Sequence, residues 1–128
     1  MVEKITAGIR ISVATHFEGA YYKNRVQQYA FGYDILIENQ SKNRVQLLSR
    51  YWEIRDALYP AEVVQGDGVI GKQPVIDPGN LHTYGSGCIL KSVFGAMSGH
   101  YNMINLQTRE KFKVHIPIFK LNAPYILN

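Results

Sequence analysis

The segment from 63 to 79 constrains the fold more than any other part of the chain. It reads Val-Val-Gln-Gly-Asp-Gly-Val-Ile-Gly-Lys-Gln-Pro-Val-Ile-Asp-Pro-Gly. Its glycines match G-x-G-x-x-G, a pattern with which dinucleotide-binding folds open a helix beneath a pyrophosphate. Pro74 and Pro78 follow at once, and a proline inside a helix removes a backbone hydrogen bond and clashes with the preceding turn. We therefore predict an irregular connection in which glycines take turn conformations.

The same residues fall short of the two nucleotide-binding motifs in other ways. The dinucleotide motif needs an acidic residue about twenty positions further on, where Lys91 lies. Residues 66–72 also match G-x-x-x-x-G-K, but a phosphate loop continues with a serine or threonine that binds magnesium. Gln73 stands at that position. Neither motif predicts a cofactor here.

Alternating apolar and polar residues predict strands in the rest of the chain. The clearest strand places these residues on one face: Tyr29, Phe31, Tyr33, Ile35 and Ile37. Further strands are predicted at 9–14, 45–59, 81–84, 88–93, 101–106 and 112–116. On 45–59 the expected inward face carries Leu48, Arg50, Trp52 and Ile54. Turns or loops are predicted at 19–25, 39–43, 77–80 and 95–99, and Pro117 is expected to end the last ladder.

This count favours an all-β immunoglobulin or fibronectin III-like β-sandwich of about seven strands. Tyr101, near the start of the penultimate predicted strand, is a candidate for a tyrosine corner. Residues Ile118, Phe119 and Leu121 are expected to pack before a tail at 122–128. A chain of 128 residues fits one domain, 1–128.

Charge and targeting features favour a soluble cytoplasmic protein. The formal net charge of +4 is small, so nucleic acid is an unlikely partner. The first residues lack the apolar run of a signal peptide, and no apolar stretch has the length of a membrane span. The single cysteine, Cys88, cannot form an internal disulfide, which fits a reducing compartment.

Catalytic and metal-binding patterns are missing from the sequence. The histidines have no ligand spacing: His16, His82, His100 and His115. Ser86 and Ser98 do not stand in a G-x-S-x-G elbow. Cys88 lies in a predicted strand, where a cysteine is usually a small buried side chain. We expect no enzymatic activity, no catalytic residue, no cofactor and no dedicated metal site.

Five motifs together resemble the ApaG family, also called CorD, over nearly the whole chain. They are Ser49-Arg50-Tyr51-Trp52-Glu53-Ile54, residues 66–74, Pro78-Gly79, residues 84–87 and Gly95-Ala96-Met97-Ser98-Gly99-His100-Tyr101. The closing strand at 112–119 also fits. Lys72 stands where the family usually has glutamate, and Gly85 where it usually has threonine. Lys72 therefore reverses one charge of the loop.

The resemblance implies a fibronectin III-like sandwich without an established nucleotide site or enzymatic activity. It also implies a genetic link to cobalt resistance and magnesium efflux, which is a phenotype rather than a metal site. Related domains in eukaryotic F-box proteins and in a DNA polymerase delta-interacting protein look like protein-interaction modules. We therefore predict a non-enzymatic module that binds a protein partner. The prediction also allows a homodimer.

The predicted partner-binding surface combines the glycine loop with its expected neighbours: Arg50, Trp52, Asp67, Gly68, Val69, Ile70 and Lys72. Exposed glycine loops present backbone groups and short apolar side chains to a partner. Equally, the loop is a purely structural connection if Val69 and Ile70 belong to the core. The alternative function is a regulatory binder of a small anion or a metal-linked ligand, with the loop amides as an anion nest.

Overall fold

The computed structural model describes residues 1–124, and in that part of the chain all regular structure is β-strand. The strands are β1 (Val2–Thr6), β2 (Ile9–Lys23), β3 (Val26–Asn39), β4 (Val45–Asp56), β5 (Glu62–Asp67), β6 (Val75–Ile76), β7 (Leu81–Leu90), β8 (Phe94–Asn105) and β9 (Lys111–Asn122). This confirms the predicted fold class, and the prediction of about seven strands is close. Residues 1–124 contain no helix that is long and apolar enough to cross a membrane.

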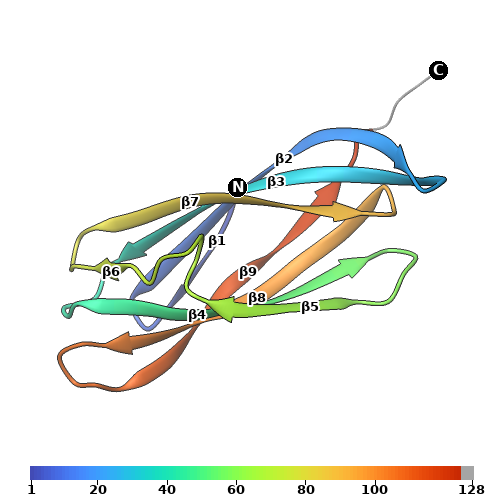
Figure 1. Ribbon diagram of the computed structural model, residues 1–128. Coiled ribbons are helices and arrows are strands. Elements are labelled where there is room, and N and C mark those ends of the chain that lie inside the picture. Colours follow the sequence, from blue (N-terminus) through green and yellow to red (C-terminus); the bar gives the residue numbers. More distant parts are fainter. Residues whose placement is uncertain (125–128) are drawn as a thin grey trace.

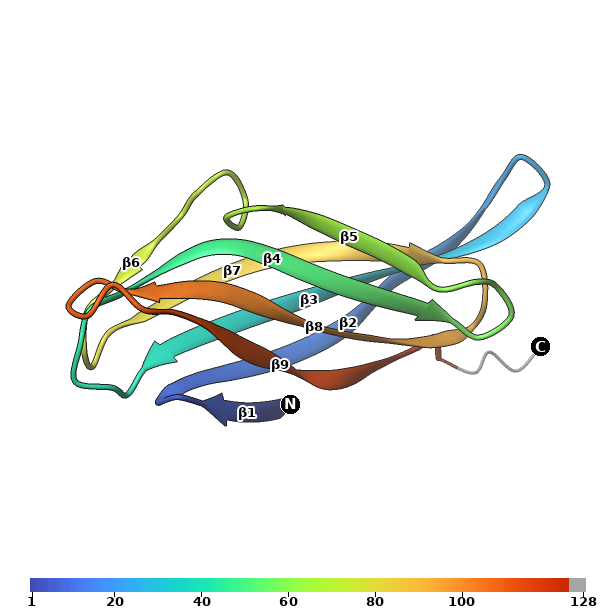
Figure 2. The same ribbon diagram turned by 90° about the horizontal axis from the view of Figure 1, so that it is seen from below.

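The strands form two antiparallel sheets that face each other (Figures 1 and 2). One sheet has the order β1-β2-β3-β7, and the other has the order β5-β4-β8-β9 with the short β6 also paired to β4. The inward side chains of both sheets form the core. Its largest fully buried side chains include Tyr101, Phe31, Ile9, Ile11, Ile35, Ile37, Leu47, Met103 and Leu121.

The two lateral sides of this sandwich differ. On one side β9 packs against β1 and β2, and the His115 N–H donates to Thr6 Oγ1 at 3.3 Å. On the other side the terminal strands are β5 and β7, one from each sheet. Below, these are called the closed side and the open side.

The long β2–β3 hairpin corrects the loop predicted at 19–25. Strand β2 continues to Lys23 and absorbs a bulge between Phe17 and Gly19. Only Asn24 and Arg25 form the turn, both with positive φ, as a two-residue hairpin connection requires. Strand β1, which has four exposed residues out of five, was not predicted because it lacks apolar alternation.

The predicted strand boundaries in the second half of the chain are also wrong, because glycines inside strands were interpreted as breaks. The pieces predicted at 81–84 and 88–93 form one strand, β7, with Gly85 opposite Asp34 and Gly87 opposite Gly32. The turn predicted at 95–99 lies inside β8. A Cβ at Gly99 would come within 2.0 Å of the Tyr51 carbonyl oxygen, so this glycine permits close approach of neighbouring backbones rather than a turn.

A bulge in β4 changes which residues of that strand face the core. The pairing with β8 shifts between Leu47 and Ser49. Leu47 is therefore fully buried, and the prediction that Leu48 faces inward is wrong. After the bulge the predicted alternation holds, with Trp52 in the core and Ile54 packed against it.

The last strand contains two further corrections. Pairing of β9 with β8 continues past Pro117 to Asn122, because a second irregularity near Gly99 accommodates the proline. Phe119 and Leu121 are buried as predicted, but Ile118 is 71% exposed. Asn122 belongs to β9 rather than to a tail, and positions 125–128 lie outside the described residues.

Tyr101 is fully buried, but it does not form the predicted tyrosine corner. Its hydroxyl makes a hydrogen bond with the Tyr84 hydroxyl, which joins β8 of one sheet to β7 of the other. A tyrosine corner instead uses the hydroxyl to bind backbone a few residues upstream. The side chain therefore ties the two sheets together beside the open side.

Candidate functional site

The glycine segment is partly a strand and partly a tight turn. Glu62–Asp67 forms β5 and pairs with β4, which corrects the prediction of an irregular connection from residue 63 onward. The turn follows between Val69 and Lys72, whose backbones exchange hydrogen bonds of 2.7 and 3.0 Å. Ile70 and Gly71 at its tip both have positive φ. A two-residue turn of this type belongs to a hairpin and not to a phosphate-binding helix.

Gly68 has a structural role in this turn. Its φ is +61°, and a Cβ would come within 2.1 Å of the Lys72 carbonyl oxygen. Its N–H donates to the Leu48 carbonyl at 2.8 Å, which ties the turn to β4. The N–H groups of Gly68, Val69 and Lys72 are thus occupied by carbonyl oxygens. Those three amides are unavailable for the anion nest that the sequence suggested.

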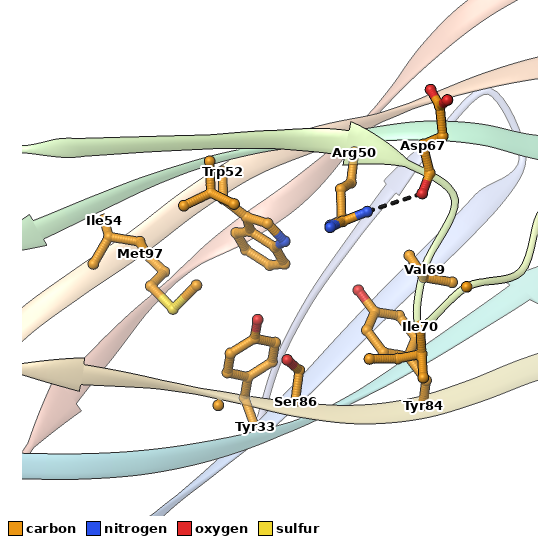
Figure 3. Close-up of a pocket in the computed structure, with 13 residues that line it drawn as sticks. Tyr33, Arg50, Trp52, Ile54, Asp67, Val69, Ile70, Tyr84, Ser86 and Met97 are labelled. Carbon is orange, nitrogen blue, oxygen red and sulfur yellow. Dashed lines mark hydrogen bonds between the residues drawn. The ribbon is translucent and has the colours of Figure 1, made fainter.

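A cavity of about 300 Å³ opens between the two sheets on the open side (Figure 3). Its lining comes from both edge strands, from β4 and from the turn: Tyr33, Arg50, Trp52, Ile54, Val64, Asp67, Val69, Ile70, Gly71, Tyr84, Ser86, Gly87 and Met97. The segment after β5 crosses from one sheet toward the other (Figure 1), and its residues Val69, Ile70 and Gly71 line one end of the cavity. The cavity is therefore a groove with one closed end.

The structure brings together five of the seven residues predicted for the partner-binding surface. The five that line the cavity are Arg50, Trp52, Asp67, Val69 and Ile70. Gly68 contributes only its carbonyl, and Lys72 is exposed beyond the turn. Of the two loop residues that the structural reading assigned to the core, Val69 is 1% exposed and belongs to it, whereas Ile70 is 63% exposed.

Arg50 places a positive charge inside the cavity. Its Nη1 donates to the carbonyl oxygens of Asp67 and Gly68, at 3.0 and 2.9 Å. The Asp67 carboxylate points away from the guanidinium (Figure 3). Gly66 leaves room for the side chain, since a Cβ there would come within 2.9 Å of Nη1 and Nη2. A side chain at position 66 would therefore push the guanidinium aside, and glycine there lets Arg50 keep this position.

Tyr33 and Tyr84 line the cavity, and Tyr101 lies behind them in the core, hydrogen-bonded to Tyr84. Burial raises the pKa values of Tyr33, Tyr84 and Tyr101, so all three hydroxyls stay protonated at neutral pH. The Ser86 hydroxyl and the charge of Arg50 lower the pKa of Tyr33 in part. Protonated phenols beside a guanidinium provide hydrogen-bond donors and acceptors but no general base.

The groove continues along the open side toward the β4–β5 turn. The next hollow shares Ile54 and Gly87 with the first and adds Glu18, Glu62, Cys88 and Ile89. A third, around Tyr59 and Lys91, shares Ile54, Glu62 and Ile89 with the second. These shared residues make one continuous surface from Ile70 to Tyr59, along the edges of β5 and β7.

Cys88 lies on the floor of the second hollow and is half-buried. Burial raises its pKa to about 11, and the carboxylates of Asp56 and Glu62 add to this effect. The thiol is therefore protonated near neutral pH, whereas a nucleophilic cysteine needs a lowered pKa. The side chain that was expected to be buried is thus only half-buried, at the surface of the hollow.

Two of the histidines lie together on the outer face of the second sheet. His100 is opposite His115 on β9 and stacks on Tyr51, with 5.0 Å between ring centres. Burial lowers the pKa of His100, and the charges of Lys113 and His115 lower it further. Across residues 1–124, no group of three or more His, Cys, Asp or Glu side chains is arranged to hold a metal ion.

Sequence reasoning missed the half of the cavity that comes from β7. Tyr84 and Ser86 are inward-facing positions of a strand that glycines made look broken. Tyr33 was assigned to the inward face of its strand alone, and Met97 was placed in the turn predicted at 95–99. Ser86 and Cys88 are polar or small residues at inward positions, a pattern that could have indicated a cavity. Their inward orientation is known only when β7 is known to be one continuous strand.

Comparisons with known proteins agree with this structure. A family model described as the ApaG domain matches residues 19–105. Protein ApaG of Brucella abortus (strain S19) is 40% identical over 97% of this chain and 95% of its own length. Protein ApaG of Proteus mirabilis is 44% identical over 80% of this chain and 81% of its own.

A solved structure shows the same fold. The crystal structure of a Bordetella pertussis protein named ApaA superposes with a TM-score of 0.84, at 33% identity over 92% of this chain and 95% of that one. This match, the family model and the two relatives extend over both sheets and the glycine turn. The chain belongs to the ApaG domain family.

Proposed function

We propose that this chain is a non-enzymatic, cytoplasmic binding module that holds an extended segment of a protein partner in the groove between β5 and β7. The observation that carries the proposal is the open side itself. Two edge strands flank a continuous groove, and edge strands present backbone N–H and C=O groups that an added strand can pair with. Extended peptides commonly bind to sheet edges in this way.

The side chains along the groove suit such a ligand. Ile70 and Ile89 are each more than half exposed, and they line the groove at its closed end and along β7. Trp52 forms the floor. Apolar contacts with an aromatic anchor at the centre are typical of the parts of interfaces that carry binding energy.

Site-specific photocrosslinking in the native cell tests the proposal. A benzophenone amino acid at Ile70 or Ile89 should capture a protein, and the same residue at Ile118 should not capture it. Ile118 is a matched control, because it is 71% exposed and lies on β9, on the closed side. Capture of the same protein from all three positions, or of none from the groove, would contradict the proposal.

The alternative is a regulatory binder of a small anion or of a metal-linked ligand, the second reading of the glycine loop. The Arg50 guanidinium inside the cavity favours the anion version. A ligand that binds only the folded state raises its melting temperature. Saturable stabilisation by pyrophosphate, nucleotides, Co²⁺ or Mg²⁺, without capture from Ile70 or Ile89, would favour this alternative over a protein partner.

A further inference from the structure

Three arginines of this fold form ion pairs with carboxylates, and Arg50 differs from them. Arg10 pairs with Glu3 and Glu38, Arg44 with Asp77, and Arg55 with Glu53. In residues 1–124, Arg50 has no carboxylate within ion-pair distance, although it points into the cavity between the sheets. Its Nη1 is satisfied by two carbonyls, and a guanidinium carries further donors on Nη2 and Nε.

A partly buried guanidinium without a counter-charge favours an anionic ligand group. Carboxylates match its planar fork with two parallel hydrogen bonds. The Tyr33 and Tyr84 side chains and the Ser86 hydroxyl line the same cavity, so further hydrogen-bond donors are close. Gly66 keeps the space around the guanidinium open on the β5 side.

The opposite charge lies further along the groove. Glu18 and Glu62 line the second hollow, and Asp56 and Glu62 line the third. The raised pKa of Cys88 reflects the carboxylates of Asp56 and Glu62 as well as burial. The groove thus has the Arg50 guanidinium at its closed end, where the Asp67 carboxylate points away from it, and an apolar part at Trp52 and Ile54. The second hollow has only carboxylates among its charged residues, and the third adds Lys91.

The register of β4 and β5 sets the spacing between these zones. Arg50 is opposite Gly66, Trp52 is opposite Val64, and Ile54 is opposite Glu62. Arg50 and the Glu62 position are therefore four residues apart along the strands, or about 13 Å at ~3.3 Å per residue. An extended peptide has the same rise, and its alternate side chains point to one side.

We propose that the partner segment carries an acidic side chain that binds Arg50, with an apolar residue two positions away over Trp52 and a basic residue four positions away beside Glu62. This inference rests on the proposed function and deepens it by naming the ligand chemistry. Charge complementarity between the groove and the segment selects the partner, since a like charge at either end is repelled. The order acidic-x-apolar-x-basic applies in one chain direction or the other.

Selection from a library of random displayed dodecapeptides tests the pattern. Enrichment on the full-length wild-type protein should give peptides with Asp or Glu at one position and the apolar and basic residues at spacings of two and four. The Kd of a selected peptide is then compared with that of the same peptide carrying Gln for Glu. The peptide change should weaken binding about tenfold or more, because a hydrogen bond to a charged group is lost.

The matching protein variants assign this loss to Arg50. In Arg50→Gln, the same peptide change should cost less than about threefold, since the two changes remove one interaction. Gly66→Ala displaces the guanidinium while keeping the charge, and it should weaken the wild-type peptide too. Arg55→Gln is the control, because Arg55 is exposed and pairs with Glu53, and it should keep the full tenfold dependence.

The outcomes separate this inference from the proposed function. Selected peptides without an acidic residue, or an acid dependence that Arg50→Gln leaves unchanged, would overturn the inference alone. No enrichment of any peptide would overturn both. If Arg50→Gln fails to fold, two measurements still test whether an acidic side chain binds Arg50. They are the affinity of Gly66→Ala for the selected peptide and the affinity of the wild-type protein for the peptide with Gln in place of Glu. Arg50-dependent stabilisation by pyrophosphate without peptide binding would assign the charge to a small anion and overturn the peptide proposal.

Discussion

The closed side and the open side of the sandwich differ in the chemistry of their inward positions. On the closed side β9 turns Val114, Ile116, Phe119 and Leu121 into the core, and all four are buried. On the open side β7 turns Tyr84, Ser86 and Cys88 inward, and these stay half-buried, whereas Leu90 at the end of the strand is buried. Opposite them the inward positions of β5 are Glu62, Val64 and Gly66.

This difference explains why the sheets meet along one side and leave a groove along the other. Apolar inward positions stabilise closure by about 25 cal/mol for each Å² of apolar surface removed from water. Hydroxyls, a thiol and a glycine offer less apolar surface, and Arg50 in the gap keeps part of its charge solvated. A sandwich edge becomes a candidate binding site where its inward face lacks large apolar side chains.

The largest expected effect tests the closed side. Leu121→Ala should lower the free energy of unfolding by about 2–5 kcal/mol, since the side chain is fully buried. Ile89→Ala on the open side should change it by less than about 1 kcal/mol, because that side chain is 53% exposed. Urea unfolding measures both. Equal losses would mean that the two sides are packed alike and would remove the basis of the comparison.

The turn that closes the groove gives the next effect. Gly68→Ala should destabilise the protein by about 1–3 kcal/mol from the positive φ alone, with the contact to the Lys72 carbonyl adding to it. Gly71→Asn is the control: φ is also positive there, no other atom lies within 4 Å of its Cβ position, and asparagine tolerates this conformation. A Gly68→Ala protein that melts with the wild type would make the turn a surface feature only.

The hydroxyl pair between the sheets gives a smaller effect. Tyr84→Phe should cost about 1–3 kcal/mol, since it leaves the buried Tyr101 hydroxyl without its partner. Adding Tyr101→Phe should cost less than the sum of the single changes, because no orphaned hydroxyl remains. Chemical denaturation of the four proteins gives the coupling. Strict additivity would show that the pair does not hold the sheets together beside the groove.

The smallest expected effect is a pH dependence of stability from His100, on the outer face of the sheet that contains β8 and β9. The pKa of His100 is lowered in the folded state, first by burial and then by Lys113 and His115. The unfolded chain therefore binds this proton more readily, and stability falls as the pH drops through the unfolded value near 6.5. His100→Gln should reduce the difference in melting temperature between pH 7.5 and pH 5.

NMR titration of the His100 ring measures the same property directly. Its midpoint should lie below 6.5 and move upward in Lys113→Met, whereas Arg50→Gln in the groove should leave it unchanged. A wild-type midpoint at or above 6.5 would contradict the lowering of the His100 pKa by burial and by Lys113. An unchanged midpoint in Arg50→Gln would show that the titration of His100 is independent of the groove.

Much of the fold was predictable, and the errors in the boundaries of β7 and β8 share one cause. The alternation at 29–37 fixed the inward face of β3, and the two prolines excluded a helix after the glycines, as β5 and the Val69–Lys72 turn confirm. Glycines at 85, 87, 95 and 99 were read as breaks. They lie instead inside strands, where neighbouring backbones approach closely. A glycine has the same identity in both settings, so only the partner strand distinguishes them.

The candidate site was half predictable for a similar reason. Arg50 and Trp52 share a strand face, and Asp67, Val69 and Ile70 share a turn, so local patterns selected them. Tyr84 and Ser86 reach the same cavity from the other sheet, across a sandwich whose strand order brings β7 opposite β5. No spacing of residues along the chain predicts that Tyr84 and Ser86 line the same cavity as Arg50.

The residues alone therefore determined the class of fold and the absence of a helix at the glycine motif, because alternation and proline act over a few neighbouring residues. Only the tertiary structure decided that one side of the sandwich stays open and that Arg50 stands inside it without a carboxylate in residues 1–124. Both properties depend on which strands become sheet edges. Edges are set by long-range pairing, which sums contacts between residues far apart in the chain.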